Sequence, residues 1–333
     1  MDKPIGWGIL ATGGIAATFV TDLARLPDAR PAAVASRSRA SAERFAATFD
    51  VPHAHVGVDA LIDDPDVDIV YIAGPHSTHH AAAKRCLSAG KPVLCEKAFT
   101  VNHRQAAELV DLARDRKVFL MEAMWMRCLP AVRRLAEVIG EGTIGEVTAV
   151  TAGFGLAGPF PPDHRLRDPA LAGGALLDLG VYPLALAQLL LGPPVAVTST
   201  GTLTSEGVDA AVAMAVRHDG GAVASLSCAI NADIPATAII SGHRGHITVP
   251  APFYRPDRLI VGSGDGENAS SRVIEAPRTG VGLCHEAAEA MRCLRQGRTQ
   301  SPLVPWQDTL DVMATMDEVR RQIGVRYPGE SVD

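Results

Sequence analysis

Short apolar runs alternate with helical stretches through the first 125 residues of the chain. The runs are IGWGIL, PAAVAS, VDIVYIAG, KPVLCEK and KVFLMEA. Between them the pattern predicts helices over residues 15–26, 40–49, 79–89 and 102–115. Nearly continuous apolar strands that alternate with helices form a parallel sheet with both faces covered. We therefore expect an α/β domain over residues 1–125.

From about Gly145 the pattern changes, and strands follow strands. The runs are EVTAVTAGFG, VAVTSTGTL, AAVAMAVRH, AVASLSCAI, TAIISG and HITVPA, separated by Gly, Asp and Pro turns. This spacing predicts an α+β domain with a mainly antiparallel sheet over residues 126–333. Two late helices, over residues 285–296 and 306–324, either pack on one face of that sheet or return to the first domain.

Length and composition agree with this division. A chain of 333 residues exceeds what one hydrophobic core usually supports, so two domains are expected. Hydrophobic residues make up 47% and charged residues 20%, as in globular proteins. The formal net charge is −6, and nucleic-acid binding would need clustered Lys and Arg, so we expect no nucleic-acid partner.

The ends and cysteines of the chain point to a compartment. The start, MDKPIGWGIL, has no long apolar stretch behind a basic segment, and no run reaches the roughly 18 residues of a membrane span. The six cysteines lie far apart without a C-x-x-C pair, which favours reduced thiols over disulfides or a zinc site. We expect a cytoplasmic protein without a membrane partner.

The stretch GWGILATGGIAATF places a glycine-rich turn between the first strand and the first helix. Dinucleotide pyrophosphates bind at such turns, against backbone N–H groups and the positive end of the helix. The fingerprint G-x-G-x-x-G/A falls on Ala11, Gly13 and Ala16, so its first glycine is missing, and alone the match is weak. The expected phosphate-binding residues are Thr12, Gly13, Gly14 and Ile15.

The end of the second strand indicates which dinucleotide is bound. NAD-binding domains carry an acidic residue there for the ribose hydroxyls, whereas this chain has Ser36, Arg37 and Ser38. Arg37 can stack on the adenine and pair with a 2′-phosphate, with the two serines adding donors. NADP is therefore the expected cofactor, with NAD possible; the alternative for Arg37 is a solvated surface residue.

Four further motifs follow in order: PHSTHH at 75–80, CEKAF at 95–99, MEAMWMRCLP at 121–130 and GGALLDLGVYP at 173–183. Together with the opening turn, their order and spacing resemble the glucose-fructose oxidoreductase/inositol dehydrogenase (Gfo/Idh/MocA) family. The last two motifs are most similar to its dimeric dihydrodiol dehydrogenase and NADP-dependent D-xylose dehydrogenase branch. The resemblance implies a Rossmann domain, a second domain with a large open sheet, and a cofactor lying between them.

The resemblance also implies the catalytic residues. The family's Glu-Lys pair matches Glu96 and Lys97, and the lysine is expected to hydrogen-bond the reacting oxygen. Most members have a His four residues after the aspartate of the last motif; here Tyr182 follows Asp178 at that distance. Tyr182 is the expected proton donor and acceptor, and Asp178 orients the site. Because residues four apart share a helix face, both side chains can point into one pocket.

Further cofactor contacts are implied on both domains. Pro75, His76 and His79 match residues on the nicotinamide side. Arg165 matches an arginine that approaches the cofactor from the second domain, although His164 replaces the usual Trp before it; its alternative is a surface ion pair.

Two local features concern a metal site and the backbone after Lys97. The histidines of HSTHH, with His53 and His55 upstream, have no Cys or carboxylate at ligand spacing, so no metal site is expected. Most family members have Pro after the Glu-Lys pair, but this chain has Ala98. A non-proline cis bond costs about 2.5 to 4 kcal/mol, so we expect a trans Lys97–Ala98 bond, or else a strained cis one.

The combined hypothesis is an NADP-dependent oxidoreductase acting on a sugar or a cyclic trans-diol. The alternatives are a ketosugar reductase of a biosynthetic pathway and a non-catalytic NADP(H)-binding sensor. Trp125, Phe154 and Phe160 supply either aromatic walls for a substrate ring or core packing. An open sheet must bury its exposed face, and the branch resemblance implies a homodimer through it.

Overall fold

The computed structural model describes residues 3–263 and 270–330. The chain forms two compact units: Met1–Trp125 with Thr279–Trp306, and Met126–Arg278 with Gln307–Asp333. The sequence predicted an uninterrupted second domain over 126–333, with a return of the late helices as one alternative. The return occurs for residues 279–306 because their backbone bonds to the first unit: Leu120 N donates to Thr299 O at 3.0 Å.

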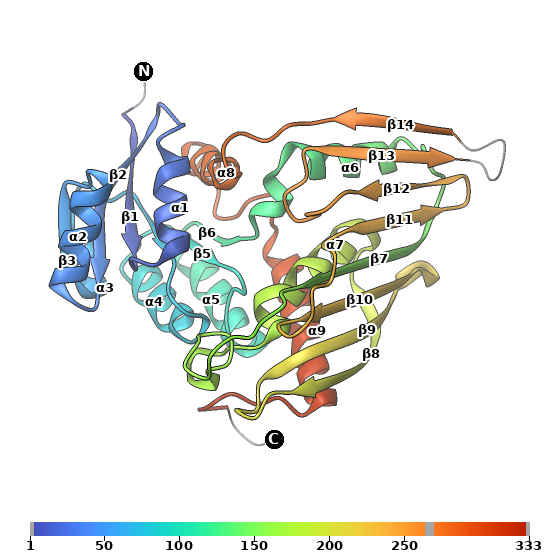
Figure 1. Ribbon diagram of the computed structural model, residues 1–333. Helices are drawn as coiled ribbons and strands as arrows, with labels where there is room; N and C mark the ends of the chain where they lie inside the picture. Colours follow the sequence, from blue (N-terminus) through green and yellow to red (C-terminus); the bar gives the residue numbers. More distant parts are fainter. Residues whose placement is uncertain (1–2, 264–269, 331–333) are drawn as a thin grey trace. The chain divides into compact units, whose positions relative to one another are not determined.

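Unit 1 contains the predicted parallel sheet (Figure 1). Its order is β3-β2-β1-β4-β5-β6, and every neighbouring pair is parallel. The strands are β1 (Ile5–Leu10), β2 (Ala29–Ser36), β3 (His53–Val56), β4 (Ile69–Ile72), β5 (Val93–Glu96) and β6 (Leu120–Ala123). The edge strand β3, HAHV, was not predicted because it is short and only half-buried.

Unit 1 also contains helices, and some of them begin at a side chain that caps the first turn. They are α1 (Gly14–Leu23), α2 (Arg39–Phe49), α3 (Gly57–Ile62), α4 (His76–Ser88), α5 (His103–Arg116) and α8 (Leu283–Arg295). The Ser38 side chain accepts from Ser41 N before α2, and Asn102 accepts from Gln105 N before α5. Helix α3 was not predicted, since its six residues give little periodic signal.

Unit 2 is built on an eight-stranded sheet of order β14-β13-β12-β11-β7-β10-β9-β8. All its pairs are antiparallel except β10 with β7. The strands are β7 (Val147–Gly155), β8 (Pro194–Leu203), β9 (Asp209–His218), β10 (Val223–Ala229), β11 (Ala238–Gly242), β12 (Gly245–Val249), β13 (Arg258–Ser263) and β14 (Ser270–Glu275). The predicted fold class, with a mainly antiparallel second sheet, is confirmed.

Helices α6 (Pro130–Gly140), α7 (Val181–Leu191) and α9 (Trp306–Ile323) pack with this sheet (Figure 1). The stretch Pro169–Leu191, a short 3-10 turn followed by the π-helical turn and α7, is long and apolar enough to cross a membrane, contrary to the sequence expectation. However, 83% of its most apolar window is buried inside the protein, as in the core helix of a globular fold.

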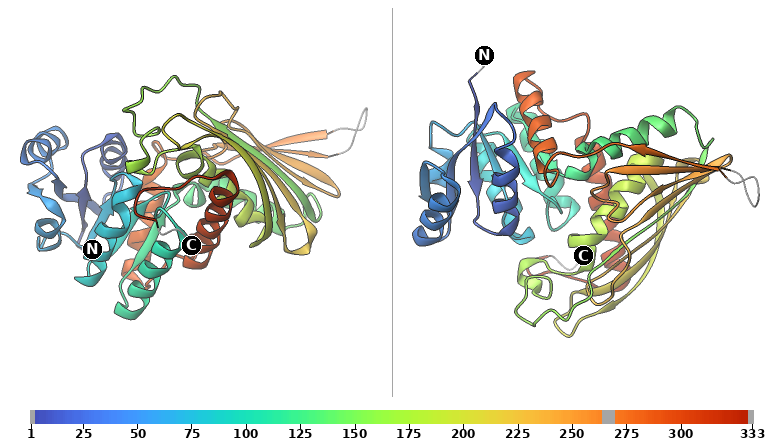
Figure 2. Two further views of the ribbon diagram at one scale, coloured as in Figure 1. Left: turned by 90° about the horizontal axis from the view of Figure 1, so that it is seen from below. Right: turned by 45° about the horizontal axis from the view of Figure 1, so that its top comes forward.

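The face of the sheet opposite α7 carries small side chains. Along β9, Val212 and Met214 are buried on one face, whereas Ala213 and Ala215 are exposed on the other. A groove of about 680 Å³ crosses this outer face, lined among others by Thr151, Thr198, Ala213, Ser225, Pro235 and Ile239. In the described chain no helix covers it (Figure 2).

Candidate active site

The glycine-rich turn has free space where side chains would lie. A Cβ added at Gly13 or Gly14 meets nothing within 4 Å, and neither residue has a positive φ. Neither packing nor backbone conformation therefore requires glycine here. Helix α1 also begins without a side-chain cap and without an acidic residue in its first turn. The turn thus presents bare backbone at a helix N-terminus, which fits a pyrophosphate group.

Ala11 occupies the position of the missing first glycine and adopts the conformation that favours one. Its φ is 105°, in the region that L-residues rarely occupy. Its N–H donates to Ala35 O at 2.9 Å, which ties the turn to the end of β2. The fold therefore keeps the fingerprint's geometry although the residue departs from it.

Arg37 lies directly after β2, at the same sheet edge as the turn. The register pairs Leu10 with Ala35, two residues before Arg37. Arg37 is exposed, and within the described residues its guanidinium has no hydrogen bond or ion pair. Ser36 is half-buried, and Ser38 caps α2 with its side chain. On the turn itself, Thr12 is half-buried and Ile15 is exposed.

The Pro75–His79 segment begins α4 after strand β4. Pro75 is the exposed N-cap, and the ring of buried His76 lies 5.7 Å from that of His79. His79 is fully buried; its Nδ1 lies 3.0 Å from Ala98 O and its Nε2 2.9 Å from Gly74 O. Because burial lowers the pKa of His79, the ring is neutral at pH 7 and donates to one carbonyl at a time.

The role of His79 as a cofactor contact stays a prediction. A ring with no exposed surface, held between two backbone carbonyls, positions the chain near Lys97.

Lys97 follows the last residue of β5, where parallel-sheet folds place their chemistry. Its peptide bond with Ala98 is cis, the second of the two expected alternatives. Glu96 is buried beneath it: the Tyr71 hydroxyl donates to Glu96 Oε1 at 2.5 Å, and Lys97 N donates to Oε2 at 3.2 Å. Glu96 therefore holds the start of this turn, and its contact with the cofactor stays a prediction.

Besides Glu96, another buried carboxyl group lies in this region, and sequence reasoning missed it. Glu286, from α8, is fully buried, and neither of its carboxyl oxygens has a hydrogen-bond partner within the described chain. Burial, with the charges of Glu96 and Glu122, raises its pKa well above the ordinary value, which favours the protonated form of Glu286. No local pattern signals this group, because it reaches unit 1 only through the return of residues 279–306.

In unit 2 the structure brings Asp178 and Arg165 together. Arg165 Nη1 and Nη2 donate to the two Asp178 oxygens at 3.0 and 3.1 Å, a bidentate pair. Asp178 is buried and lies in a π-helical turn, Leu176–Gly180, that leads into α7. The expected helix is present, but its first turn winds more widely than the α geometry assumed for Asp178 and Tyr182. Their convergence into one pocket stays a prediction.

Tyr182, at the start of α7, lies in a cluster of aromatic rings. Its ring centroid is 6.0 Å from Phe154 and 5.1 Å from Tyr254, and these two stack at 4.6 Å. The Arg255 guanidinium lies 5.8 Å from the Tyr254 ring. Sequence reasoning missed Tyr254, which has no motif around it.

The two other aromatic candidates lie elsewhere. Phe160 stacks on His164 at 4.6 Å, and Trp125 is the last residue of the first segment of unit 1. Lys97 belongs to unit 1 and Tyr182 to unit 2. Their action on one oxygen stays a prediction.

The expectation that no carboxylate accompanies the histidines needs correction. Asp64, eleven residues after His53, lies within hydrogen-bonding distance of both His53 and His55. The sequence separation hid this contact, because helix α3 brings the chain back to the strand.

The geometry can be compared with known proteins. Residues 5–124 match the NAD-binding Rossmann domain of an oxidoreductase family, and residues 132–248 match the GFO/IDH/MocA C-terminal domain. Trans-1,2-dihydrobenzene-1,2-diol dehydrogenase from Bos taurus is 36% identical over 332 residues, covering 97% of this chain and 98% of that protein. The chain belongs to the Gfo/Idh/MocA oxidoreductase family.

Other proteins similar to this Gfo/Idh/MocA member carry informative names. D-xylose 1-dehydrogenase (NADP(+)) from Hypocrea jecorina is 39% identical over 368 residues, covering 97% of this chain and 93% of that protein. Among solved structures, a 3-ketoreductase from Actinomadura kijaniata in complex with NADP and TDP-benzene has a TM-score of 0.86 at 28% identity. That match covers 96% of this chain and 98% of the other. The resemblance seen in the motifs is confirmed.

Proposed function

We propose that this protein is an NADP-dependent oxidoreductase that transfers hydride between the nicotinamide and a hydroxyl or carbonyl carbon of a sugar or cyclic trans-diol. The observation that carries the proposal is the bare Gly13-Gly14 turn with exposed Arg37 at the end of the adjoining strand. The names of the dihydrodiol and D-xylose dehydrogenases support the substrate class, and the NADP in the ketoreductase structure supports the cofactor.

The residues of unit 1 fit the two ends of the dinucleotide. The backbone N–H groups of Thr12–Ile15 hold the pyrophosphate at the start of α1. Arg37 pairs with the 2′-phosphate, with Ser36 and Ser38 beside it. Pro75 and His76 lie on the nicotinamide side. When bound, the cofactor supplies the hydride acceptor or donor.

Proton transfer is assigned to Tyr182 and Lys97. During oxidation the ionised Tyr182 oxygen would take the proton of the substrate hydroxyl and become a neutral phenol, and during reduction the Tyr182 hydroxyl would give its proton to the carbonyl oxygen. The Lys97 ammonium donates a hydrogen bond to the same substrate oxygen and stabilises negative charge on it. Asp178, which accepts hydrogen bonds from both terminal nitrogens of the Arg165 guanidinium, orients the site. The rings of Phe154 and Tyr254 lie beside the Tyr182 ring.

Steady-state reduction of NADP with a panel of aldoses and trans-dihydrodiols tests the reaction. Tyr182→Phe keeps the ring but removes the proton-carrying hydroxyl, so we expect kcat to fall by about 10² to 10⁴. The Kd for NADPH should change by less than about threefold, since Tyr182 is assigned to the substrate. No turnover by wild-type protein with any substrate of the panel would reject the substrate class.

Arg37→Ala tests the cofactor preference. Loss of one charge-assisted pair with the 2′-phosphate should raise the Kd for NADPH by about 10-fold to 100-fold. The Kd for NADH should hardly change, because NADH lacks that phosphate. An equal rise in the Kd for NADPH and for NADH would show that Arg37 does not distinguish the two cofactors.

Two alternative functions would give different results in assays with NADP and NADPH. A ketosugar reductase, favoured by the likeness to the ketoreductase, would oxidise NADPH with ketosugars faster than it reduces NADP with aldoses. A non-catalytic sensor would bind NADPH tightly and transfer hydride to no carbonyl. A sensor would need neither Lys97 nor Tyr182, and the chain has both, so the enzyme is preferred.

We also propose a homodimer formed through the outer face of the sheet in unit 2, and action in the cytoplasm. The small, exposed side chains of that face support the first. The six cysteines are all free and buried, which supports a reducing compartment. The net charge of −6 supports the absence of a nucleic-acid partner.

A further inference from the structure

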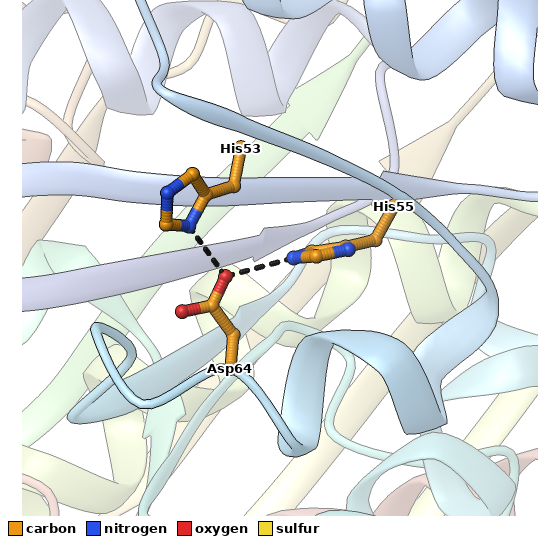
Figure 3. A group of neighbouring side chains, drawn as sticks. All are labelled: His53, His55 and Asp64. Atoms are coloured by element: carbon orange, nitrogen blue, oxygen red, sulfur yellow. Dashed lines mark hydrogen bonds and ion pairs between the residues drawn. The ribbon is translucent and has the colours of Figure 1, made fainter.

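Two imidazoles and one carboxylate meet at the edge of the parallel sheet in unit 1. His53 and His55 are two residues apart on β3, so their side chains lie on the same face of the strand. Asp64 follows α3. Its Oδ2 lies 2.7 Å from His53 Nδ1 and 2.8 Å from His55 Nε2 (Figure 3). The three ligand atoms all lie within 4.8 Å of one another.

This cluster is separate from the nucleotide turn. The loop that carries Asp64 lies at the amino ends of β1 and β2: Asp66 pairs with Arg30 at 2.7 Å, and Asp68 accepts from Gly6 N at 2.7 Å. The glycine-rich turn and Arg37 follow the carboxyl ends of the same strands. The two histidines are level with Ala33 and Ala35 of β2, so the cluster lies on the edge strand beside β2 and not on the turn that follows β1.

The carboxylate of the cluster is already held in place by hydrogen bonds. Its Oδ1 accepts from Asp66 N at 2.9 Å, and Lys91 Nζ donates to Asp64 O at 3.1 Å. The Asp64 side chain is 3% exposed, so little rearrangement remains for it on binding.

The two histidines, in contrast, are open to solvent. The His53 side chain is 43% exposed and the His55 side chain 26%, so an ion and its water ligands can enter from that side. Two imidazole nitrogens and one carboxylate oxygen, with an open position for water, are a donor set that Zn²⁺ accepts. We propose that His53, His55 and Asp64 form a site for a divalent transition-metal ion, with Zn²⁺ as the preferred occupant.

Metal binding requires changes in the protons and hydrogen bonds of the cluster. The metal-facing nitrogen of each ring must present its lone pair, so its proton moves to the other ring nitrogen or to solvent. The two hydrogen bonds to Asp64 Oδ2 are then replaced by metal–ligand bonds of about 2.0 to 2.2 Å. The ion would link the edge strand β3 to the loop after α3, and protons would compete with it in acid.

Titration calorimetry of the full chain with ZnCl₂ at neutral pH tests the site, with CoCl₂ as a spectroscopic substitute. We expect about one equivalent of Zn²⁺ and a visible Co²⁺ absorption band of low-symmetry coordination. Asp64→Asn and His53→Gln each remove one ligand while nearly keeping its shape, and each should weaken Zn²⁺ binding at least about 100-fold. His243→Gln, which changes an exposed histidine of unit 2, should leave it unchanged.

Two results would overturn the site. One is wild-type protein that binds no Zn²⁺ more tightly than about 100 μM. The other is binding that Asp64→Asn and His53→Gln leave unaltered, which would place the ion elsewhere. Unchanged NADPH binding by both variants would show that they are folded. If they lose thermal stability while wild-type protein binds no Zn²⁺, the cluster is only a hydrogen-bonded contact.

Discussion

At the scale of single residues, the turn that is expected to hold the cofactor has one unfavourable residue. Ala11 has a φ of 105°, which costs an L-residue about 1 to 2 kcal/mol. Glycine removes that cost but adds about 0.5 to 1 kcal/mol of unfolded-state entropy. We expect Ala11→Gly to raise the free energy of unfolding by up to about 1 kcal/mol, measured from the midpoint of urea unfolding.

Gly13→Ala is the matched comparison. Gly13 has a φ of −81°, and its added Cβ meets open space. The stability should change by less than about 1 kcal/mol, whereas the Kd for NADPH should rise. A loss of stability in Ala11→Gly, or unchanged NADPH binding in Gly13→Ala, would contradict this account of the turn.

Glu286 provides a pH-dependent prediction. Its folded-state pKa is raised well above the ordinary value of 4.5, so above that pH the folded state holds a proton that the unfolded state releases. This group therefore lowers stability as the pH rises, by at most about 1.4 kcal/mol per pH unit. Glu286→Gln removes the titrating proton, so the variant should be more stable than wild-type protein at pH 8 and similar at about pH 5.

Urea unfolding at the two pH values measures the effect. Glu43→Gln is the control, because Glu43 is exposed on α2 and its ion pair is long, with 3.7 Å between Glu43 Oε1 and Arg39 Nη1. That change should alter neither midpoint by much. A Glu286→Gln protein that is less stable than wild type at pH 8 would show that the carboxyl group is ionised in the fold.

At the scale of elements, α8 is held at its start by one carboxylate of α1. Asp22 Oδ1 accepts from Val281 N at 3.0 Å, and its Oδ2 accepts from Gly282 N at 2.8 Å and Leu283 N at 2.9 Å. Asp22→Ala leaves these N–H groups buried without an acceptor, and we expect a loss of about 3 kcal/mol. Asp22→Asn, which keeps one acceptor oxygen, should lose less.

Hydrogen exchange of the α8 amides measures this effect locally. Faster exchange in α8 with unchanged exchange in α5 is the expected result for Asp22→Ala. The hydrogen bonds to the backbone lower the pKa of Asp22 despite its burial, so the same contact weakens as the pH falls below about 3.8. Unchanged exchange in α8 would show that Asp22 does not hold it.

Most helices and strands could be predicted because their apolar runs or helical repeats extend over enough residues to be recognised. The strands of the parallel sheet and helices α1, α2, α4 and α5 follow directly from alternation and capping. The edge strand β3 and helix α3 are too short and polar for that signal. The π-helical turn at Asp178 depends on packing around α7, which no local spacing records.

At the scale of the whole molecule, the proposed dimer can be tested on the outer face of the sheet. Ala215 is exposed on β9, in the groove of about 680 Å³. Ala215→Arg would place a charge in an interface that excludes water, so we expect a monomer by light scattering where wild-type protein is a dimer. Asp111→Arg, on the exposed side of α5, is the control and should remain dimeric. A monomeric wild-type protein would contradict the proposal.

The family and fold could be predicted from the order of the motifs, but the surroundings of the site could not. Lys97, Asp178 and Tyr182 stand in recognisable motifs. Glu286 and Tyr254 do not, because their positions depend on where distant segments return. The same holds for Asp64, whose approach to His53 and His55 requires the turn made by α3.

The return of residues 279–306 to unit 1 has a consequence for biosynthesis. The first 125 residues, which contain all six strands of the parallel sheet, leave the ribosome long before the segment that contains α8, so unit 1 is complete only when nearly the whole polypeptide has been made. A recombinant fragment ending at Trp125 would expose the surface on which α8 packs. The chain therefore matures as one product, and truncation is a poor way to isolate either half.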